Sequence, residues 1–557
     1  MILEDSMRRW QIRSWLWLIA LALFLALSLY QLALPGPNYD EAVEAKPAVQ
    51  LLQHMPIEAH RNAVIHLFGS TLPLMVVDYV GALNTYALLL YFKLGGISVV
   101  TMRLWPITVA AMVLWLTWKL GRELFGLRTG FLAAILLAVQ PSFVFFARQG
   151  IYVTNTTIAL MLAIWLALLR LMITGRARWF WFAAFMAGLG LWAKFIMLWP
   201  LLATTCLLPI IWLKRKELGL NPDSEFTPRM LLRLHFSVGA ILAFLMGMAP
   251  FLLFNVKTGA TFRHFMGTLN QSYYGVENAA YLQNLVVRWG QMKDFTRGDH
   301  FWYLGGNFAD VFAWPAFLIA FVFIIVILVW RWQQKKIRSL ALRALLVYAF
   351  FLLLLIQTPL TPTALWYTHL AMFSPVIALG IAAGWDLFFW QLPARTGLAL
   401  AGVFLAVMLL SGLRADIGYH KTLTATGGYA DHSDAVYRLS DALSLRGIYN
   451  PYALDWGFDA PIFLVSKGQV NPIEIFSYES FDKPDAGFAD RVAPLLQSSD
   501  TYFLLHAPDR TNFPGRREAL LALADTFNIQ LETVAVIRER SGAPHTEIVH
   551  PVQNGQD

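Results

Sequence analysis

The residues best suited to chemistry stand directly after the first apolar stretch, in PGPNYDEAVEA. This segment carries the adjacent acids Asp40 and Glu41, and Glu44 follows. A carboxylate can accept a proton from an incoming hydroxyl, which is the task of a general base. The same acids also suit the first turn of a helix, where Asn38 or Asp40 would cap the backbone and carboxylates face the positive end of the helix dipole. The sequence leaves both interpretations open, a catalytic carboxylate and a helix cap.

Basic side chains stand at the ends of several apolar stretches. Arg103 precedes the second stretch, Arg148 ends the third in FFARQGIY, and Lys194 ends the fifth in LWAKF. Arg pairs with two phosphate oxygens at once, and Lys adds a point charge. These cations could instead extend to the lipid headgroups, a common role for Lys and Arg at helix ends. Together with nearby Asp78 and Tyr79, in LMVVDYVGAL, they favour a site that handles a lipid-linked phosphate.

Histidines give a weaker signal. His369, in LWYTHLAMFSP, could hydrogen-bond a substrate, although such a residue more often packs in the core. The histidines and acids of the outer loops match no metal-ligand spacing, so we expect no metal and no other cofactor; they are His54, His60, His66, Asp294, Asp299 and His300. The loop over residues 256–310 carries Tyr273 and Tyr274 beside Gly275 and is either a mobile cover over the site or a plain surface excursion.

The elements that must position these residues are membrane helices. The chain has 557 residues, of which 57% are hydrophobic and 14% charged, whereas soluble domains average about 25% charged residues. A helix needs about 20 apolar residues to cross a bilayer. A soluble globular enzyme is excluded, and we predict a mainly α-helical polytopic protein. The expected spans lie near residues 12–34, 98–120, 130–147, 152–173, 179–195, 197–213, 234–255, 312–330, 340–357, 364–388 and 397–413.

The distribution of basic residues predicts the orientation in the membrane. With a cytoplasmic N-terminus, the inside loops hold 20 of the 31 Lys and Arg of residues 1–413, as the positive-inside rule requires. We therefore expect a multi-pass protein of the plasma or inner cell membrane, with the first apolar stretch retained as an anchor and an exoplasmic C-terminus. The expected span interiors are almost free of acids, and Asp386 falls at a cytoplasmic end, which argues against a proton- or sodium-coupled transporter.

The region after residue 413 has a different composition. Residues 1–413 carry 31 Lys and Arg against 16 Asp and Glu, and residues 414–557 carry 12 against 19. Because the positive charge belongs to the membrane part, the basic pI of 9.4 does not indicate nucleic-acid binding. A helical pattern, SDAVYRLSDALSLRG, and strand-like runs, APIFLVS, TYFLLHA and ETVAVIRE, predict a small α/β domain. We thus expect a transmembrane domain over 1–413 and an exoplasmic soluble domain over 414–557.

Five motifs, in order along residues 12–413, resemble the GT-C superfamily of membrane glycosyltransferases. The resemblance is to the family-39 group of protein mannosyltransferases and their aminoarabinose-transferring relatives. The motifs are YDEA, the loop LPLMVVDYVGALNTYALLLYFKLGGISVVTMRLWP, ARQG, GLGLWAKF and APFLLFNVKTG. One position departs from the family: many relatives have an acid shortly after the arginine of ARQG, where this chain has Asn155 in RQGIYVTN.

The resemblance implies inverting transfer of a sugar from a polyprenyl-phosphate donor to a hydroxyl of a protein, lipid or glycan acceptor on the outer face. Asp40 would act on the acceptor hydroxyl, and Glu41 would support it or hold the sugar. The donor phosphate would be bound by Arg148, Lys194 and Arg103. The substrate pocket would include Asp78, Tyr79, His369 and Asn255.

Two other functions remain open from the sequence. A flippase or exporter of a lipid-linked glycan would use the same outer-face cations, but it would need a polar path across the acid-poor spans. A non-enzymatic assembly protein would use its acidic C-terminal region to dock a partner.

Overall fold

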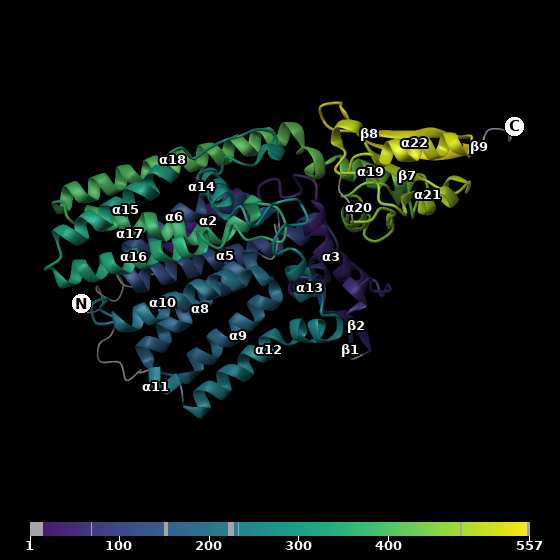
Figure 1. The fold of residues 1–557 in the computed structure, drawn as a ribbon. Helices are drawn as coiled ribbons and strands as arrows, with labels where there is room; N and C mark the ends of the chain where they lie inside the picture. Colours follow the sequence, from purple (N-terminus) through teal and green to yellow (C-terminus); the bar gives the residue numbers. More distant parts are fainter. Residues whose placement is uncertain are drawn as a thin grey trace.

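The computed structural model describes residues 15–67, 69–149, 154–220, 228–231, 233–478 and 482–553. Long helices make up the chain as far as Thr426, and an α/β part follows at one end of the helical body (Figure 1). Helix α17 (Ser374–Phe389) lies at the centre of the body. It belongs to the apolar segment Tyr367–Phe389, and 94% of the 18-residue apolar stretch in this segment is buried.

The helices of the body coincide with the expected spans. They are α2 (Trp17–Leu29), α5 (Val99–Phe125), α6 (Leu127–Ala138), α7 (Pro141–Arg148), α8 (Thr154–Thr174), α9 (Ala177–Ala193), η2 (Phe195–Met197), α10 (Leu198–Leu213), α12 (Leu234–Thr258), α15 (Ala313–Trp330), α16 (Lys335–Leu355), η4 (Tyr367–Phe373), α17 and α18 (Ala394–Thr426). The short helix α11 (Pro228–Leu231) precedes α12.

Fewer helices of the described residues meet the length of a membrane span than the eleven spans expected. Among the described residues, eight helices are long and apolar enough to cross a membrane, or nine if the bent pair α6 and α7 is one span. That pair bends by 61°, because Pro141 cannot donate a helical hydrogen bond to the preceding turn. The described part of α2 is only 13 residues long, and α9 has 17. The protein is a multi-pass membrane protein of mainly helical fold.

Surface elements fill the two long connections. The first contains α3 (Tyr39–Leu52), whose first turn was expected from the sequence, and α4 (Leu83–Gly95), with η1 (His60–Asn62) and two hairpins between them. The hairpins are β1 (Val64–Leu67) with β2 (Ser70–Pro73) and β3 (Met75–Val77) with β4 (Val80–Gly81). The second connection contains α13 (Ala260–Gly267), α14 (Tyr281–Arg297) and η3 (Trp302–Leu304).

The C-terminal part is built on a mixed five-stranded sheet in the order β6-β5-β7-β9-β8. Its strands are β5 (Tyr452–Ala453), β6 (Ile473–Glu474), β7 (Phe503–His506), β8 (Ile529–Arg538) and β9 (Pro544–Gln553). Its helices are η5 (Ala430–His432), α19 (Ala435–Leu445), α20 (Asp459–Val465), α21 (Phe488–Leu496), η6 (Pro508–Arg510) and α22 (Arg516–Thr526). Helix α18 continues past residue 413 to Thr426, so this part follows Gly427.

One expected strand is wrong. The run APIFLVS forms helix α20, with Asp459 and Pro461 in its first turn, where an acid and a proline are both favourable. The run is buried on nearly all sides, and a short apolar run of this kind does not by itself distinguish a strand from a buried helix. The expected helix at α19 and the expected strands at β7 and β8 are confirmed.

The C-terminal part packs directly on the segment that follows α2. Lys46 of α3 lies 2.8 Å from the carboxylate of Asp459, and the backbone N–H of Gly36 donates to the carbonyl of His432 at 2.9 Å. A Cβ on Gly36 would lie 2.1 Å from the carbonyl oxygen of Ser433. Only glycine therefore allows the two backbones to approach this closely.

Gly36→Ala should loosen this contact. The added methyl group overlaps the backbone of Ser433, and overpacking of this kind costs about 1–3 kcal/mol. We expect a lower melting temperature and faster proteolytic release of the C-terminal part in detergent. Gly402→Ala is the matched control, because a Cβ there meets nothing within 4 Å. Equal melting temperatures for the two variants would contradict the role of Gly36.

Candidate active site

A buried ion pair holds the acidic segment in place. Arg103 of α5 is fully buried and donates from Nε and Nη2 to the two carboxylate oxygens of Glu41, at 3.0 and 2.5 Å. The same guanidinium donates to the carbonyl groups of Leu32, Pro35 and Gly36. One side chain thus fixes both the chain leaving α2 and the first turn of α3.

Glu41 also completes the cap of α3. The amide of Asn38 donates to Oε1 of Glu41 at 2.9 Å, and the amide of Asp40 donates to Oδ1 of Asn38 at 3.0 Å. This is a capping box, which satisfies backbone donors at a helix start. The helix-cap interpretation is confirmed for Asn38 and Glu41. Since all five N–H groups of Arg103 are engaged, this arrangement leaves no donor for the phosphate expected there.

Asp40 faces away from this pair, toward Lys194 and three tyrosines. It is partly exposed. Its negative charge acts on Lys194 and on the hydroxyls of Tyr79, Tyr273 and Tyr274. Burial, and then charges that include Asp40, raise the pKa of Tyr274 to about 12. Asp40 is therefore a partly exposed carboxylate of the segment whose charge acts on a nearby cation.

Lys194 stands in the connection between α9 and η2, outside both helices. Its backbone bridges to Val80, which brings it up to the loop of β3 and β4. The side chain is 7% exposed. Burial lowers the pKa of Lys194 to about 8, and the charges of Glu44 and Asp40 oppose this shift. The structure brings together two expected site residues, Asp40 and Lys194, and adds Glu44, whose Oε2 accepts from Asn84 at 2.7 Å.

Tyr273 and Tyr274 come from the long connection between α12 and α15, whereas Tyr79 stands between β3 and β4. The hydroxyl of Tyr273 lies 3.2 Å from that of Tyr79, and the rings of Tyr273 and Tyr274 lie 4.7 Å apart. Tyr274 also packs edge-on against Trp366 at 5.8 Å. These contacts bring the loop over residues 256–310, here called the cover loop, to Tyr79. Whether the loop is a mobile cover or a plain surface excursion stays a prediction.

Asp78 belongs to an adjoining cluster. It accepts from Nε and Nη2 of Arg61 at 2.6 and 2.8 Å and contacts His60 at 2.8 Å and His264 at 3.6 Å. Burial alone would raise the pKa of Asp78, but the hydrogen bonds from Arg61 and His60 hold it well below its usual range. The ring of His264 lies 5.2 Å from that of Tyr79. Arg61 and His264 escaped the sequence reasoning, because surface loops carry many such residues.

Arg148 lies deeper than Asp40. It is fully buried, and Nη2 donates to the carbonyl groups of Tyr30 and Gln31. Nη1 contacts Nδ1 of His420 in α18 at 3.3 Å. Its charge interacts with those of Glu41 and Asp416, and Asp416 is fully buried in α18 beyond the expected end of that span. This placement fixes the end of α2.

Two further expected pocket residues have other partners. Nδ1 of His369 contacts Nη2 of Arg288 at 3.2 Å, and Arg288 is a buried cation that the sequence reasoning missed. The side-chain amide of Asn255 donates from Nδ2 to the backbone carbonyl of Phe251 in the same helix at 3.0 Å. Asn155, the departure from the family pattern, lies in a segment whose side chains are outside the described residues.

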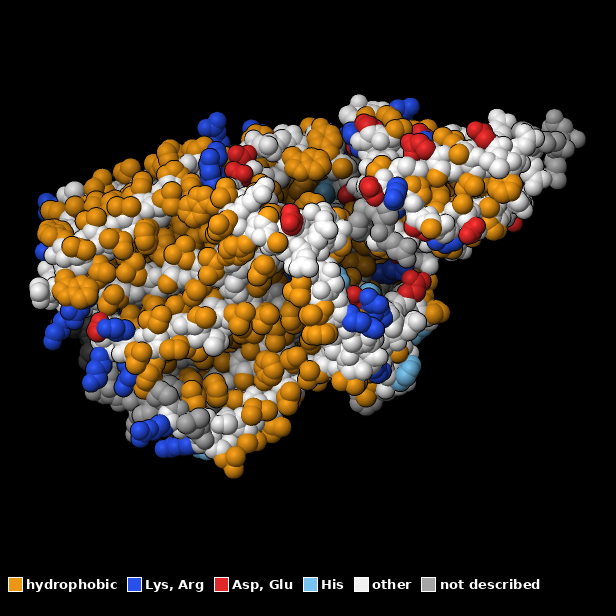
Figure 2. Space-filling model, in the orientation of Figure 1, with side chains coloured by type: hydrophobic (Ala, Val, Ile, Leu, Met, Phe, Trp, Pro, Cys, Tyr) orange, Lys and Arg blue, Asp and Glu red, His pale blue; other side chains and the backbone are white. Residues whose placement is uncertain are grey.

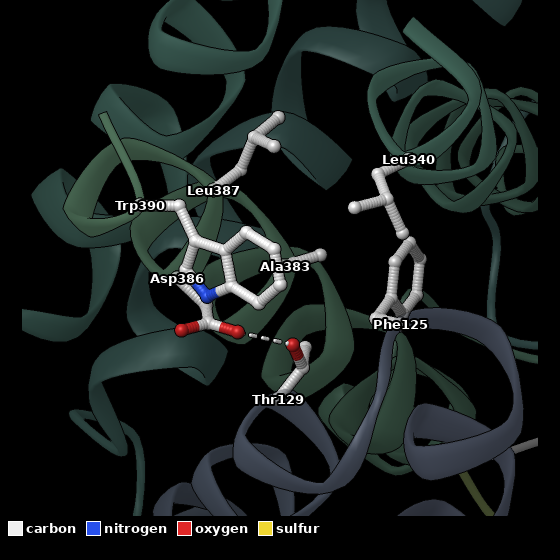
Figure 3. A pocket seen from close by; sticks show the side chains of 7 residues that line it. All are labelled: Phe125, Thr129, Leu340, Ala383, Asp386, Leu387 and Trp390. Atoms are coloured by element: carbon white, nitrogen blue, oxygen red, sulfur yellow. Dashed lines mark hydrogen bonds between the residues drawn. The ribbon is translucent and has the colours of Figure 1, made fainter. Parts of the chain in front are cut away.

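A small pocket lies at the far end of α6 and α17, among Phe125, Leu340, Leu387 and Trp390 (Figure 3). Its one acid, Asp386, accepts from Thr129 at 2.6 Å and pairs with Arg128 at 3.3 Å. This pocket offers no reactive group. Within the described ranges, no three His, Cys, Asp or Glu side chains are grouped as a metal site would require.

Comparison with known proteins supports the resemblance. Residues 82–219 match the family described as Dolichyl-phosphate-mannose-protein mannosyltransferase. The resemblance to this group, and the enzyme class that it implies, a membrane glycosyltransferase, are confirmed at the level of this match. A search of curated proteins finds no match to the chain.

Solved structures share the fold. ArnT from Cupriavidus metallidurans in the apo state gives a TM-score of 0.56 at 12% identity, over 98% of this chain and 98% of that chain. The same protein bound to undecaprenyl phosphate gives 0.54 at 12%, over 95% and 97%. The apo oligosaccharyltransferase from Archaeoglobus fulgidus gives 0.51 at 13%, over 98% and 75%. The architecture is thus an ArnT-like GT-C fold with a C-terminal mixed sheet.

Arg103→Met should destabilise the protein strongly. Removing one partner of a buried ion pair leaves an unpaired buried charge and costs about 3–5 kcal/mol. Arg128→Met is the control, because Arg128 is 51% exposed and exposed pairs contribute about 0–1 kcal/mol. The free energy of unfolding in detergent distinguishes the two. If the Arg103→Met protein were as stable as the control, the buried position of Glu41 would not depend on its ion pair with Arg103.

Proposed function

We propose that the protein transfers a sugar from a polyprenyl phosphate to an acceptor hydroxyl, in the opening between α3 and the cover loop. The observation that carries this proposal is the electrostatic interaction of Asp40 with Lys194. The backbone of Lys194 bridges to Val80, and the neighbouring Tyr79 contacts Tyr273 of the cover loop at 3.2 Å. The likeness to ArnT, which has been solved with undecaprenyl phosphate bound, supports this class of donor. The positive-inside distribution supports an opening on the outer face.

In this proposal Asp40 is the general base. Its carboxylate takes the proton of the acceptor hydroxyl while that oxygen forms a bond to the anomeric carbon from the face opposite the phosphate. The bond between the anomeric carbon and the phosphate oxygen breaks, and its electron pair stays on the polyprenyl phosphate. Attack from the opposite face inverts the anomeric configuration.

Lys194 serves the leaving group. Negative charge grows on the phosphate as the bond breaks, and a fixed cation in a water-poor site stabilises that charge by a few kcal/mol. Lys194 is buried beside two acids, so its charge is positioned before the donor arrives. In this proposal Arg103 is a positioning residue, because Glu41 and carbonyl groups engage all its donors. Arg148 positions the end of α2 through the carbonyl groups of Tyr30 and Gln31.

Asp40→Asn should lower transfer by about 10²- to 10⁴-fold, which is the usual contribution of a positioned base. The substitution keeps the shape of the side chain, so the melting temperature should not change. The measurement is release of polyprenyl phosphate from labelled polyprenyl-phosphate hexoses and pentoses in purified membranes. Asp441→Asn, an exposed acid on α19, is the control and should retain activity. Full turnover by Asp40→Asn would remove Asp40 as the base.

The kcat/KM for the polyprenyl-phosphate donor should change near pH 8. Below the pKa of Lys194, about 8, the ammonium is charged and binds phosphate; above it the charge is lost. We therefore expect kcat/KM for the donor to fall above pH 8, by up to about tenfold per pH unit, since one proton is involved.

Lys194→Gln tests this assignment. The variant should have a low kcat/KM for the donor that no longer changes between pH 7 and 9 (roughly one unit either side of the pKa). Lys93→Gln, at an exposed position of α4, should keep the wild-type profile. An unchanged inflection in Lys194→Gln would assign the titration to another group.

A further inference from the structure

The C-terminal part forms a second wall beside Asp40. Tyr39, the neighbour of Asp40 in the chain, packs against Trp456 with ring centroids 4.8 Å apart. Nδ2 of Asn38 lies 3.4 Å from Nε2 of His432. Figure 2 shows the molecule hollowed between the helical body and the C-terminal part. Residues from both ends of the sequence therefore meet beside Asp40.

Polar side chains of the C-terminal part gather next to Trp456. Nδ2 of Asn512 donates to Oδ1 of Asp431 at 2.6 Å. A Cβ on Gly457 would lie 3.9 Å from Oδ1 of Asp431, 3.9 Å from Cε1 of His506 and 4.0 Å from Nδ2 of Asn512. Gly457 has φ of +101°, a conformation that side-chain-bearing residues rarely adopt. A carboxylate, an amide and an imidazole thus lie within 4.0 Å of the position that a Cβ of residue 457 would take.

This group is held in a fixed geometry by a buried acid. Oδ2 of Asp455 accepts from the backbone N–H of Asn512 at 3.0 Å and contacts Nδ1 of His506 at 3.1 Å. Oδ1 accepts from the amide of Phe513 at 2.9 Å. Asp455 is 4% exposed. The loop that carries Asn512 is therefore positioned before any ligand arrives, which lowers the entropic cost of binding.

The cover loop connects this wall to Asp40. The charges of Asp40 and Asp431 both act on the hydroxyl of Tyr274. Tyr274 thus lies within electrostatic reach of both carboxylates. Tyr274 packs against Trp366, and Tyr39 packs against Trp456.

We propose that Trp456, Asp431 and Asn512 bind the acceptor, and that the acceptor is an uncharged saccharide whose hydroxyl is presented to Asp40. This inference rests on the proposed function and adds the acceptor class to it. An indole ring offers an apolar face to the C–H groups of a sugar ring, while a carboxylate accepts from its hydroxyls and an amide both donates and accepts. Two acids at the cleft disfavour a phosphorylated acceptor, since like charges repel.

The test uses the full-length protein in nanodiscs with a labelled polyprenyl-phosphate sugar. Three acceptor probes are compared: maltotriose as a free saccharide, octyl β-D-glucoside as a lipid-linked one, and a hexapeptide that contains Ser and Thr. We expect one or both glycosides to accelerate the release of polyprenyl phosphate and to receive the label, and the peptide to do neither. The two glycosides distinguish a soluble from a membrane-bound source of the saccharide.

Variants assign the binding residues. Asp431→Asn and Trp456→Ala should each raise the KM for the glycoside about tenfold or more, the cost of one lost charged hydrogen bond or ring contact, while the donor KM stays within about twofold. Trp456→Phe keeps a ring and should give a smaller rise; it also keeps the test decisive if Trp456→Ala fails to fold. Asp441→Asn, an exposed acid of the same part, should leave the glycoside KM unchanged.

Failure of the inference differs from failure of the proposed function. If the wild-type protein releases no polyprenyl phosphate with any donor, even to water, the glycosyltransferase proposal is overturned and the acceptor assignment with it. If release occurs but only the peptide accelerates it, or no probe does, the saccharide assignment is overturned. An unchanged glycoside KM in both Asp431→Asn and Trp456→Phe overturns the assignment of the C-terminal wall.

Discussion

The buried pair of Arg103 and Glu41 determines where every other group of the site can lie. Its guanidinium joins α5 to the chain that leaves α2 and to the first turn of α3. Because Glu41 is drawn inward, the neighbouring Asp40 is turned toward the opening. The adjacent acids thus have different tasks: one is enclosed, hydrogen-bonded and structural, and the other borders the cleft. A buried ion pair contributes little net stability but strongly penalises alternative arrangements, which suits a segment whose direction must be fixed.

The cations of the site divide in the same way. Arg148 and Arg103 are fully buried and donate mainly to carbonyl groups and to Glu41. Lys194 remains beside Asp40 and Glu44. An arginine fork can hold several acceptors in one plane, whereas a lysine presents a compact charge whose pKa responds to burial. The arginines therefore build the frame, and the proposed function assigns the donor phosphate to the lysine.

The C-terminal part is joined to the membrane part through contacts on both sides of Asp40. Its backbone meets Gly36 before α3, and Asp459 of α20 pairs with Lys46 within α3. Trp456 packs on Tyr39 between these contacts. The segment that carries Asp40 is therefore held by the C-terminal part as well as by the membrane helices.

Hydropathy alone located the membrane helices, since crossing a bilayer requires about 20 apolar residues whatever the surroundings. Local patterns likewise indicated α3 and its cap, and the order of charged residues along the spans pointed to Asp40 and Lys194. Sequence position reports depth in the membrane, but not which way a side chain faces around the bundle. The tertiary structure alone therefore separated Lys194 from Arg148, enclosed Glu41, and brought Trp456 to a tyrosine more than four hundred residues earlier. Those pairings depend on lateral packing between distant helices, for which a single sequence carries no local signal.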